Sequence, residues 1–209
     1  MGLLRWMGRR RQREAATAAM LQGRLREAAT AFRDYLHTSP RDWEAWGYLG
    51  DCHFDLGEPE AAEQALLRSL ELNPECVETR ETLALLYGER DGAWDRCLSM
   101  LDRCLAQTTR AGVPELTELS LAWAYHLQGD EAAAREHFGR AVGGATAEDI
   151  EKDAVLAPLE YRTGVLYHAL RDDDTRALAH LREVARLSPE SSYAHRAQEL
   201  IGRLASAKA

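Results

Sequence analysis

Apolar residues recur along the chain at helical spacing, in pairs of segments that a glycine separates and a proline follows. The clearest copy reads Trp46-x2-Leu49-Gly50-x2-His53, Gly57, Ala62-x3-Leu66 and Pro74. Gly23 lies 34 residues before Gly57, and Pro40 lies 34 residues before Pro74. Apolar residues three or four positions apart favour amphipathic helices, glycine favours a turn, and the residue before proline is pushed out of the helical region. The pattern therefore predicts helix–turn–helix units in tandem.

With this period and these residues, the chain resembles the tetratricopeptide repeat family, whose 34-residue unit is a pair of antiparallel helices. The resemblance covers about residues 9–189. It predicts five pairs, at about 9–40, 43–74, 77–109, 115–148 and 158–189. The implied fold is all-α, a right-handed superhelical solenoid of antiparallel helix pairs. One unit cannot bury its apolar face alone, so the copies stack and leave a long concave surface for partners.

Several segments depart from the repeat pattern. Asp172 stands where the fifth pair should have its turn glycine. Insertions near 112–114 and 146–157 precede the fourth and fifth pairs, and Thr146 and Asp149 form a capping box that predicts a short extra helix. Residues 1–8 form a basic and apolar N-terminal segment, and residues 190–206 predict a C-terminal capping helix. Its apolar stripe contains Tyr193, Ala197, Leu200 and Leu204, and its solvent face contains Arg196, Glu199 and Arg203.

The composition is that of a soluble folded protein, with 45% hydrophobic and 29% charged residues. No apolar run is long enough to span a membrane, and the first residues lack the order of a secretory signal, so we expect a cytoplasmic protein. The formal charge is −8, and because residues 1–13 carry five arginines and no acid, residues 14–209 carry −13. An acidic body disfavours nucleic acid and favours basic partners. Only Lys152 and Lys208 are lysines, a bias typical of a GC-rich bacterial genome.

The chain lacks the common motifs of catalysis and metal binding. The cysteines form no CxxC pair and are interpreted as small buried residues: Cys52, Cys76, Cys97 and Cys104. The seven histidines are scattered, and the usual nucleotide-binding and hydrolase patterns do not occur. We therefore expect no enzyme activity, no cofactor and no metal ion.

In tetratricopeptide repeat proteins the first helix of each pair lines the concave groove, so the resemblance implies which residues face a ligand. These are Tyr48, Asp51, Asp55, Glu81, Leu85, Leu119, Trp123, Arg162 and Leu166. The groove is then acidic towards its N-terminal half and apolar towards its C-terminal half. The paired Lys, Arg and Asn residues of a carboxylate clamp are missing from it. A helix or extended segment with basic residues and apolar anchors complements such a surface.

Trp123 has two interpretations. Tryptophan is enriched among residues that dominate binding energy, which favours an exposed anchor. The helix at 116–127, however, is apolar on more than one face, which is typical of a buried helix. If Trp123 is buried, the inserted segment 146–157 or a second copy of the chain is a candidate to cover it.

The resulting hypothesis is a non-catalytic interaction scaffold or adaptor that binds a peptide or helix of another protein in its concave groove. Leu119, Trp123 and Leu166 would provide apolar contacts, and Asp51, Asp55 and Glu81 would attract basic residues. One alternative is a structural protein that assembles with itself through uncovered apolar patches. Another is an adaptor that lies on an anionic membrane surface through the arginine-rich residues 1–13.

Overall fold

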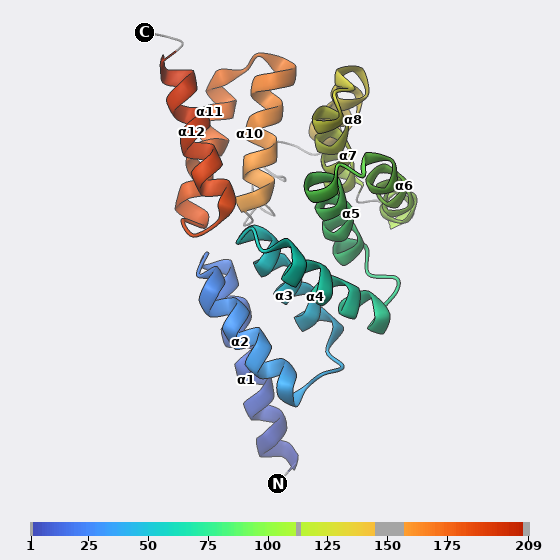
Figure 1. Cartoon of the computed structure of the whole chain (residues 1–209), viewed down its shortest axis with the longest axis vertical. Coiled ribbons are helices and arrows are strands. Elements are labelled where there is room, and N and C mark those ends of the chain that lie inside the picture. Colours follow the sequence, from blue (N-terminus) through green and yellow to red (C-terminus); the bar gives the residue numbers. More distant parts are fainter. Residues whose placement is uncertain (1, 112–113, 145–156, 207–209) are drawn as a thin grey trace.

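The computed structural model describes residues 2–111, 114–144 and 157–206. Within these ranges the chain is an all-α solenoid of antiparallel helix pairs, as predicted (Figure 1). In chain order the helices are α1 (Gly2–Leu21), α2 (Leu25–Thr38), α3 (Trp43–Asp55), α4 (Pro59–Leu72), α5 (Val77–Asp91), α6 (Trp94–Ala111), α7 (Glu115–Gln128), α8 (Glu131–Gly144), α10 (Ala157–Arg171), α11 (Asp174–Leu187) and α12 (Ser192–Ser206). The first ten form five pairs in this order, and α12 packs against α10 and α11 at the C-terminal end.

The turns inside the pairs share one backbone conformation. Each of the first four turns contains a glycine in the left-handed region, for example Gly23 with φ 70° and Gly92 with φ 64°. In the fifth turn Asp172 has φ 52°, in the same region. Because aspartate tolerates this region better than most residues with a Cβ atom, the turn keeps its geometry although the sequence departs from the pattern.

Small residues allow the two helices of a pair to lie close together. A Cβ atom added to Gly50 of α3 would lie 2.6 Å from the Leu66 side chain of α4, closer than real Cβ atoms come. Leu66 fills the space that the missing side chain leaves and is fully buried. At the start of α3, the Asp42 side chain accepts a hydrogen bond from the Ala45 amide, which caps the helix.

The hydrophobic core follows the array from one pair to the next. One cluster of buried side chains joins α1–α4, a second joins α4 and α5, and the largest extends from α5 to α12. Across the three clusters, the largest fully buried side chains include Phe32, Leu66, Trp123, Phe138 and Tyr193. Each helix pair therefore depends on its neighbours for the burial of its apolar face, as expected for stacked repeats.

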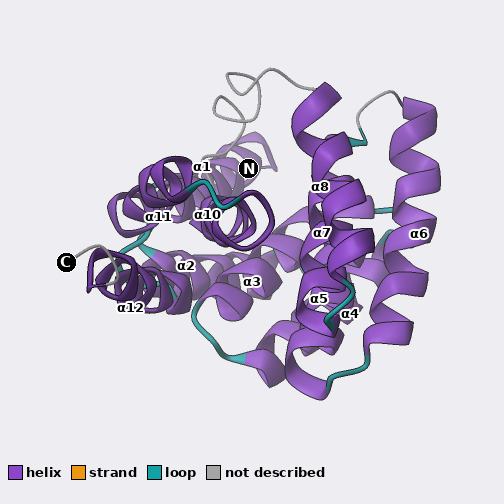
Figure 2. Cartoon of the chain, turned by 90° about the horizontal axis from the view of Figure 1, so that it is seen from above, coloured by secondary structure: helices purple, strands orange, loops and turns teal. Residues whose placement is uncertain are grey.

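The array closes on itself. Figure 1 shows α10, α11 and α12 directly above the α1–α2 pair, and Figure 2 shows them lying over that pair when seen from above. The contact is direct, since the Ser188 hydroxyl donates to the Gly23 carbonyl at 3.5 Å and the Arg26 amide donates to Glu190 Oε2 at 3.3 Å. We call the contact of α12 and its preceding turn with the α1–α2 turn, α3 and α5 the closing interface.

The remaining segments differ from the sequence-based expectation or lie outside the described residues. Helix α1 begins at Gly2, so residues 2–8 belong to the first helix instead of preceding it. The extra helix expected within 146–157 falls on residues that the structure does not describe, apart from Ala157, which begins α10. Among the described helices, none is long and apolar enough to cross a membrane.

Candidate functional site

The four apolar residues expected to line an open groove are in the core. Leu85, Leu119, Trp123 and Leu166 have exposed fractions of 2%, 3%, 1% and 0%. The prediction that they form an accessible apolar surface is therefore wrong for this closed arrangement. The reason is that they share one buried cluster with side chains of α10, α11 and α12, so their apolar area is buried inside the chain.

Trp123 is covered by side chains of α5 and α10. Its ring meets the Tyr161 ring of α10 edge to face, with the centroids 5.9 Å apart. Its indole Nε1 donates a hydrogen bond to Glu89 Oε1 of α5 at 2.9 Å. Of the two interpretations, the structure thus supports a buried tryptophan that joins three first helices.

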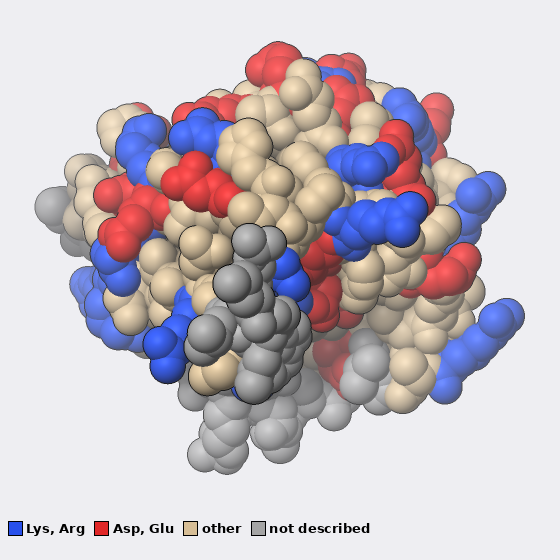
Figure 3. All heavy atoms as spheres, turned by 90° about the horizontal axis from the view of Figure 1, so that it is seen from below, with Lys and Arg blue, Asp and Glu red and all other residues tan. Residues whose placement is uncertain are grey.

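The acidic residues of the predicted groove lie in the interior of the ring. Asp51 and Asp55 on α3 and Glu81 on α5 are half-buried, as is Tyr48. Burial raises the pKa of Asp51 to about 6 and that of Glu81 to about 7, although hydroxyls of Thr82 and Thr117 hydrogen-bond to them. Burial and the Asp51 charge raise the pKa of Asp55 well above its usual range. Figure 3 shows acidic side chains gathered in a central recess of the lower face.

Among the described residues, Arg162 is a cation that faces these carboxyl groups. It lies on α10 with an exposed fraction of only 8%, and its Nε has no hydrogen-bond partner among the described residues. Burial opposes its charge, but Tyr193, Glu89 and Asp55 outweigh that effect and raise the pKa of Arg162. The predicted site residues Asp55 and Arg162 are thus brought together in an interior polar cluster.

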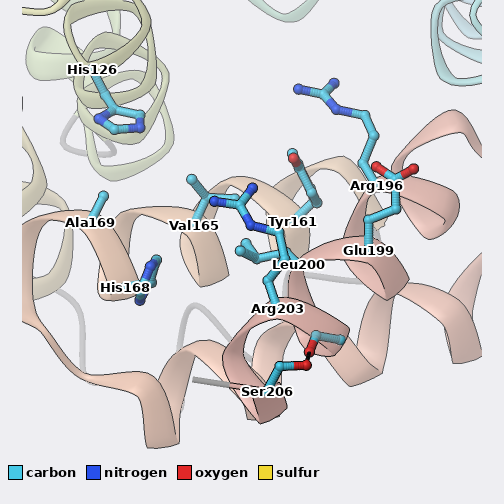
Figure 4. A pocket seen from close by; sticks show the side chains of 11 residues that line it. His126, Tyr161, Val165, His168, Ala169, Arg196, Glu199, Leu200, Arg203 and Ser206 are labelled. Carbon is cyan, nitrogen blue, oxygen red and sulfur yellow. Dashed lines mark hydrogen bonds between the residues drawn. The ribbon is translucent and has the colours of Figure 1, made fainter. Parts of the chain in front are cut away.

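An open pocket lies elsewhere on the concave side, between α7, α10 and α12. It encloses about 990 Å³, within the range of small-molecule and peptide side-chain sites. Figure 4 shows the side chains that three helices contribute to it. The lining residues are His126, Tyr161, Val165, His168, Ala169, Arg196, Glu199, Leu200, Gly202, Arg203 and Ser206. We call this site the α7–α10–α12 pocket.

The pocket combines apolar side chains with the guanidinium groups of Arg196 and Arg203 and with the carboxylate of Glu199, which pairs with His195 at 3.3 Å. Val165 and Leu200 are partly buried residues that pack on the core. Arg203 is exposed, and no ion pair with it is found among the described residues. His126 and His168 each contact a carboxylate of their own pair, at 3.0 Å and 2.7 Å. The pocket can therefore hold an apolar side chain beside an anionic group.

Arg196 separates this pocket from the interior of the ring. Its guanidinium lies 4.7 Å from the centroid of the Tyr161 ring and 5.4 Å from that of Tyr193, and it pairs with Glu89 at 3.7 Å. The sequence pattern places Arg196 and Arg203 on a solvent face of a capping helix. The sequence predicts that these two residues share one face of α12. It does not predict which helices that face contacts, because the contacting residues are distant in sequence.

No cluster of three or more metal-ligating side chains occurs in the described part of the chain. The four cysteines are all buried and free. Burial raises the pKa of the Cys52 thiol, and the same effect raises the pKa of Cys97 to about 12 and of Cys104 to about 11. Such thiols are poor nucleophiles, because the thiolate is the reactive form.

Comparisons with known proteins agree on the fold. The tetratricopeptide repeat family model matches residues 13–75, and no curated protein matches the sequence. A thermophilic tetratricopeptide repeat protein from Thermus thermophilus is 20% identical, with a TM-score of 0.64 over 92% of this chain and 98% of that one. One from Parabacteroides merdae is 19% identical, with a TM-score of 0.63 over 84% of this chain and 64% of that one, which is therefore the longer protein. YrrB, described as a tetratricopeptide repeat protein with an unusual peptide-binding site, is 16% identical, with a TM-score of 0.50 and 90% coverage of both chains. The chain therefore contains tetratricopeptide repeats at residues 13–75 and has a tetratricopeptide repeat fold.

Proposed function

We propose that this protein is a non-catalytic scaffold that binds a segment of another protein in the α7–α10–α12 pocket. The tetratricopeptide repeat fold suggests protein–protein interaction, and the structurally similar YrrB is described as having a peptide-binding site. The observation that carries the proposal is the pocket itself, which is large, open and on the side of the array formed by the first helices. Fold alone does not determine function, so the argument rests on this site.

The pocket favours a segment with one bulky apolar residue and an acidic residue beside it. The apolar residue would contact Val165 and Leu200, and the acidic residue would face Arg203. A helical or an extended segment can present this pair of side chains. The expectation of basic partner residues was tied to Asp51, Asp55 and Glu81, whose charges face Arg162 inside the closed ring.

A display library of peptides tests this function. Peptides selected on the wild-type protein would be measured by fluorescence anisotropy against the Arg203→Glu variant. We expect at least tenfold weaker binding, since a charge-assisted contact becomes a repulsion. Arg182→Glu makes the same charge change on exposed α11, outside the pocket, and should bind like the wild type. Equal affinity of both variants, with unchanged circular dichroism, would exclude the pocket as the binding site.

A further inference from the structure

The closing interface brings α12 against the concave side of α3 and α5. The Tyr193 ring of α12 meets the Phe54 ring of α3 edge to face, with centroids 6.4 Å apart. Arg196, one helical turn further along α12, pairs with Glu89 of α5 at 3.7 Å. Tyr193 is 1% exposed, so α12 covers this part of the groove with an aromatic ring and a cation on one helix face.

The backbone of the α1–α2 turn also packs closely against the turn before α12. A Cβ atom on Gly23 would lie 2.0 Å from the Leu187 carbonyl oxygen and 2.7 Å from Ser188 Cα. These are backbone atoms, so a side chain at this position cannot be accommodated by a rotamer change. The turn before α12 therefore lies directly on the α1–α2 turn, and any residue other than glycine would separate the two.

The closing interface combines one close backbone contact with a cavity and long hydrogen bonds. A cavity of about 250 Å³ lies within it, lined by Phe54, Gly57, Pro59, Leu86, Glu89, Arg90, Ser192, Tyr193 and Arg196. Its hydrogen bonds are long, at 3.3 Å and 3.5 Å. Of the described residues of α1–α4, the largest apolar cluster includes only the partly buried Phe54, whereas the clusters that join neighbouring pairs contain many fully buried side chains. The ring therefore opens most easily at this interface.

The charges across the interface are complementary. The side formed by α3 and α5 contributes the carboxyl groups of Asp55 and Glu89, and the side formed by α10 and α12 contributes Arg162 and Arg196. Opening the ring would leave acidic groups beside the exposed Phe54 ring. Such a face accepts another helix with the same two features as α12.

We propose that α12 is an internal ligand of the α3–α5 face, and that a partner helix with an aromatic residue followed three positions later by an arginine replaces it when the ring opens. Tyr193 and Arg196 are the occupants in the closed chain and define what the face accepts. The α3–α5 face lies outside the α7–α10–α12 pocket, although Arg196 of α12 lines both cavities, and the proposal does not depend on binding in that pocket. The chain would then bind such a partner only in its open form.

A comparison of two glycines tests the opening step. Gly23→Ala and Gly92→Ala place a Cβ atom at nearly the same positive φ, but Gly92 has no atom within 4 Å of that position. Both variants therefore strain a turn to a similar degree, and only Gly23→Ala disturbs the closing interface. We expect a larger radius of gyration by small-angle X-ray scattering for Gly23→Ala alone. Amide exchange at residues 188–194 should be at least tenfold faster in that variant. If Gly23→Ala is as compact and as protected as Gly92→Ala, the closing interface is not where the ring opens.

A labelled peptide with the sequence of residues 189–206 tests the binding step. It should bind Gly23→Ala at least tenfold more tightly than Gly92→Ala or the wild type, because the internal α12 competes for the face in closed chains. The same peptide with Tyr193→Ser and Arg196→Glu should not bind. Equal binding of both peptides, or of all three proteins, would overturn the proposal.

If Gly23→Ala loses helix content, Glu190→Lys provides a second way to open the ring. Glu190 is exposed, and its carboxylate accepts the Arg26 amide across the closing interface. A lysine there removes the acceptor and adds repulsion near Arg24 and Arg26 without altering the core. The same scattering and peptide measurements then apply. A compact Glu190→Lys protein that does not bind the peptide would also count against the internal-ligand proposal.

Discussion

At the scale of single residues, the described part of the ring interior holds more carboxyl groups than cations. Asp51, Asp55 and Glu81 share this region with Glu78 and with the buried Arg162. The charges of these acids could be read from the sequence, and so could their places on the first helices. Their burial could not be, because α10 and α12 close the groove from more than 70 residues further along the chain.

The raised pKa values predict that the protein is less stable at high pH. A carboxyl group whose pKa is higher in the folded than in the unfolded state holds its proton longer when folded, so stability falls as the pH rises through that range. With a pKa of about 7 for Glu81, this group alone should lower the free energy of unfolding by about 2 kcal/mol between pH 5 and pH 8. Urea unfolding at both pH values measures the loss, and Glu81→Gln should reduce it. A free energy of unfolding that rises over this range would contradict the assignment.

Substitutions of Trp123 and Leu127 compare a core residue with a surface residue of the same helix, α7. Removal of the buried ring in Trp123→Ala should lower the free energy of unfolding by about 4 kcal/mol. Leu127, on the same helix, is 37% exposed, and Leu127→Ala should cost less than about 1 kcal/mol. Denaturant titration of both variants measures the difference. Equal, small losses would show that Trp123 is not a core residue.

At the scale of elements, the last two helix pairs share an arrangement of three side chains. In the fifth pair, Glu160 of α10 lies 2.8 Å from His180 of α11, and the Tyr167 ring stacks on that histidine at 5.4 Å. The corresponding residues of the fourth pair are Glu118, His137 and Tyr125. The buried polar contact fixes the two helices of a pair against each other, beside the small-residue contact that the repeat pattern predicts.

Loss of the buried Glu160–His180 contact should destabilise the protein more than loss of an exposed histidine–carboxylate contact. In His180→Ala the Glu160 carboxylate, 8% exposed, loses its partner, and the expected loss of stability is about 3 kcal/mol. His168→Ala removes a histidine that is 37% exposed and pairs with Asp174, and should cost less than about 1 kcal/mol. Thermal or urea unfolding of the two variants gives the comparison. A similar effect for both would mean that the buried pair contributes only as a surface pair does.

At the scale of the whole molecule, the sequence predicts the all-α repeat fold but not the closed ring. The repeat pattern is local, since period, turn glycines and small residues act within one pair or between neighbours. Closure depends on the sum of small rotations between successive pairs. These rotations depend on how each pair packs, which no single motif encodes.

Because the array is closed, its first repeat should be protected from local unfolding better than the terminal repeat of an open array. In an open array the terminal repeats contact one neighbour only and exchange their amide hydrogens fastest. Here α2 contacts α3 on one side and the turn before α12 on the other. We expect the central amides of α2 to be protected within tenfold of those of α5 in native-state hydrogen exchange. Markedly faster exchange in α2 would indicate that the ring is open in solution.

The contact of Gly23 with the Leu187 carbonyl has a consequence for the evolution and redesign of the chain. Open arrays gain or lose whole units with little penalty, because their ends meet nothing. Here one unit more or fewer would move the turn before α12 away from the α1–α2 turn. The closing contact therefore fixes the number of helix pairs, in the same way that closure of a β-propeller fixes its number of blades. Duplicating or deleting a single pair should yield an open, less stable product, whereas point changes on the outer helices are tolerated.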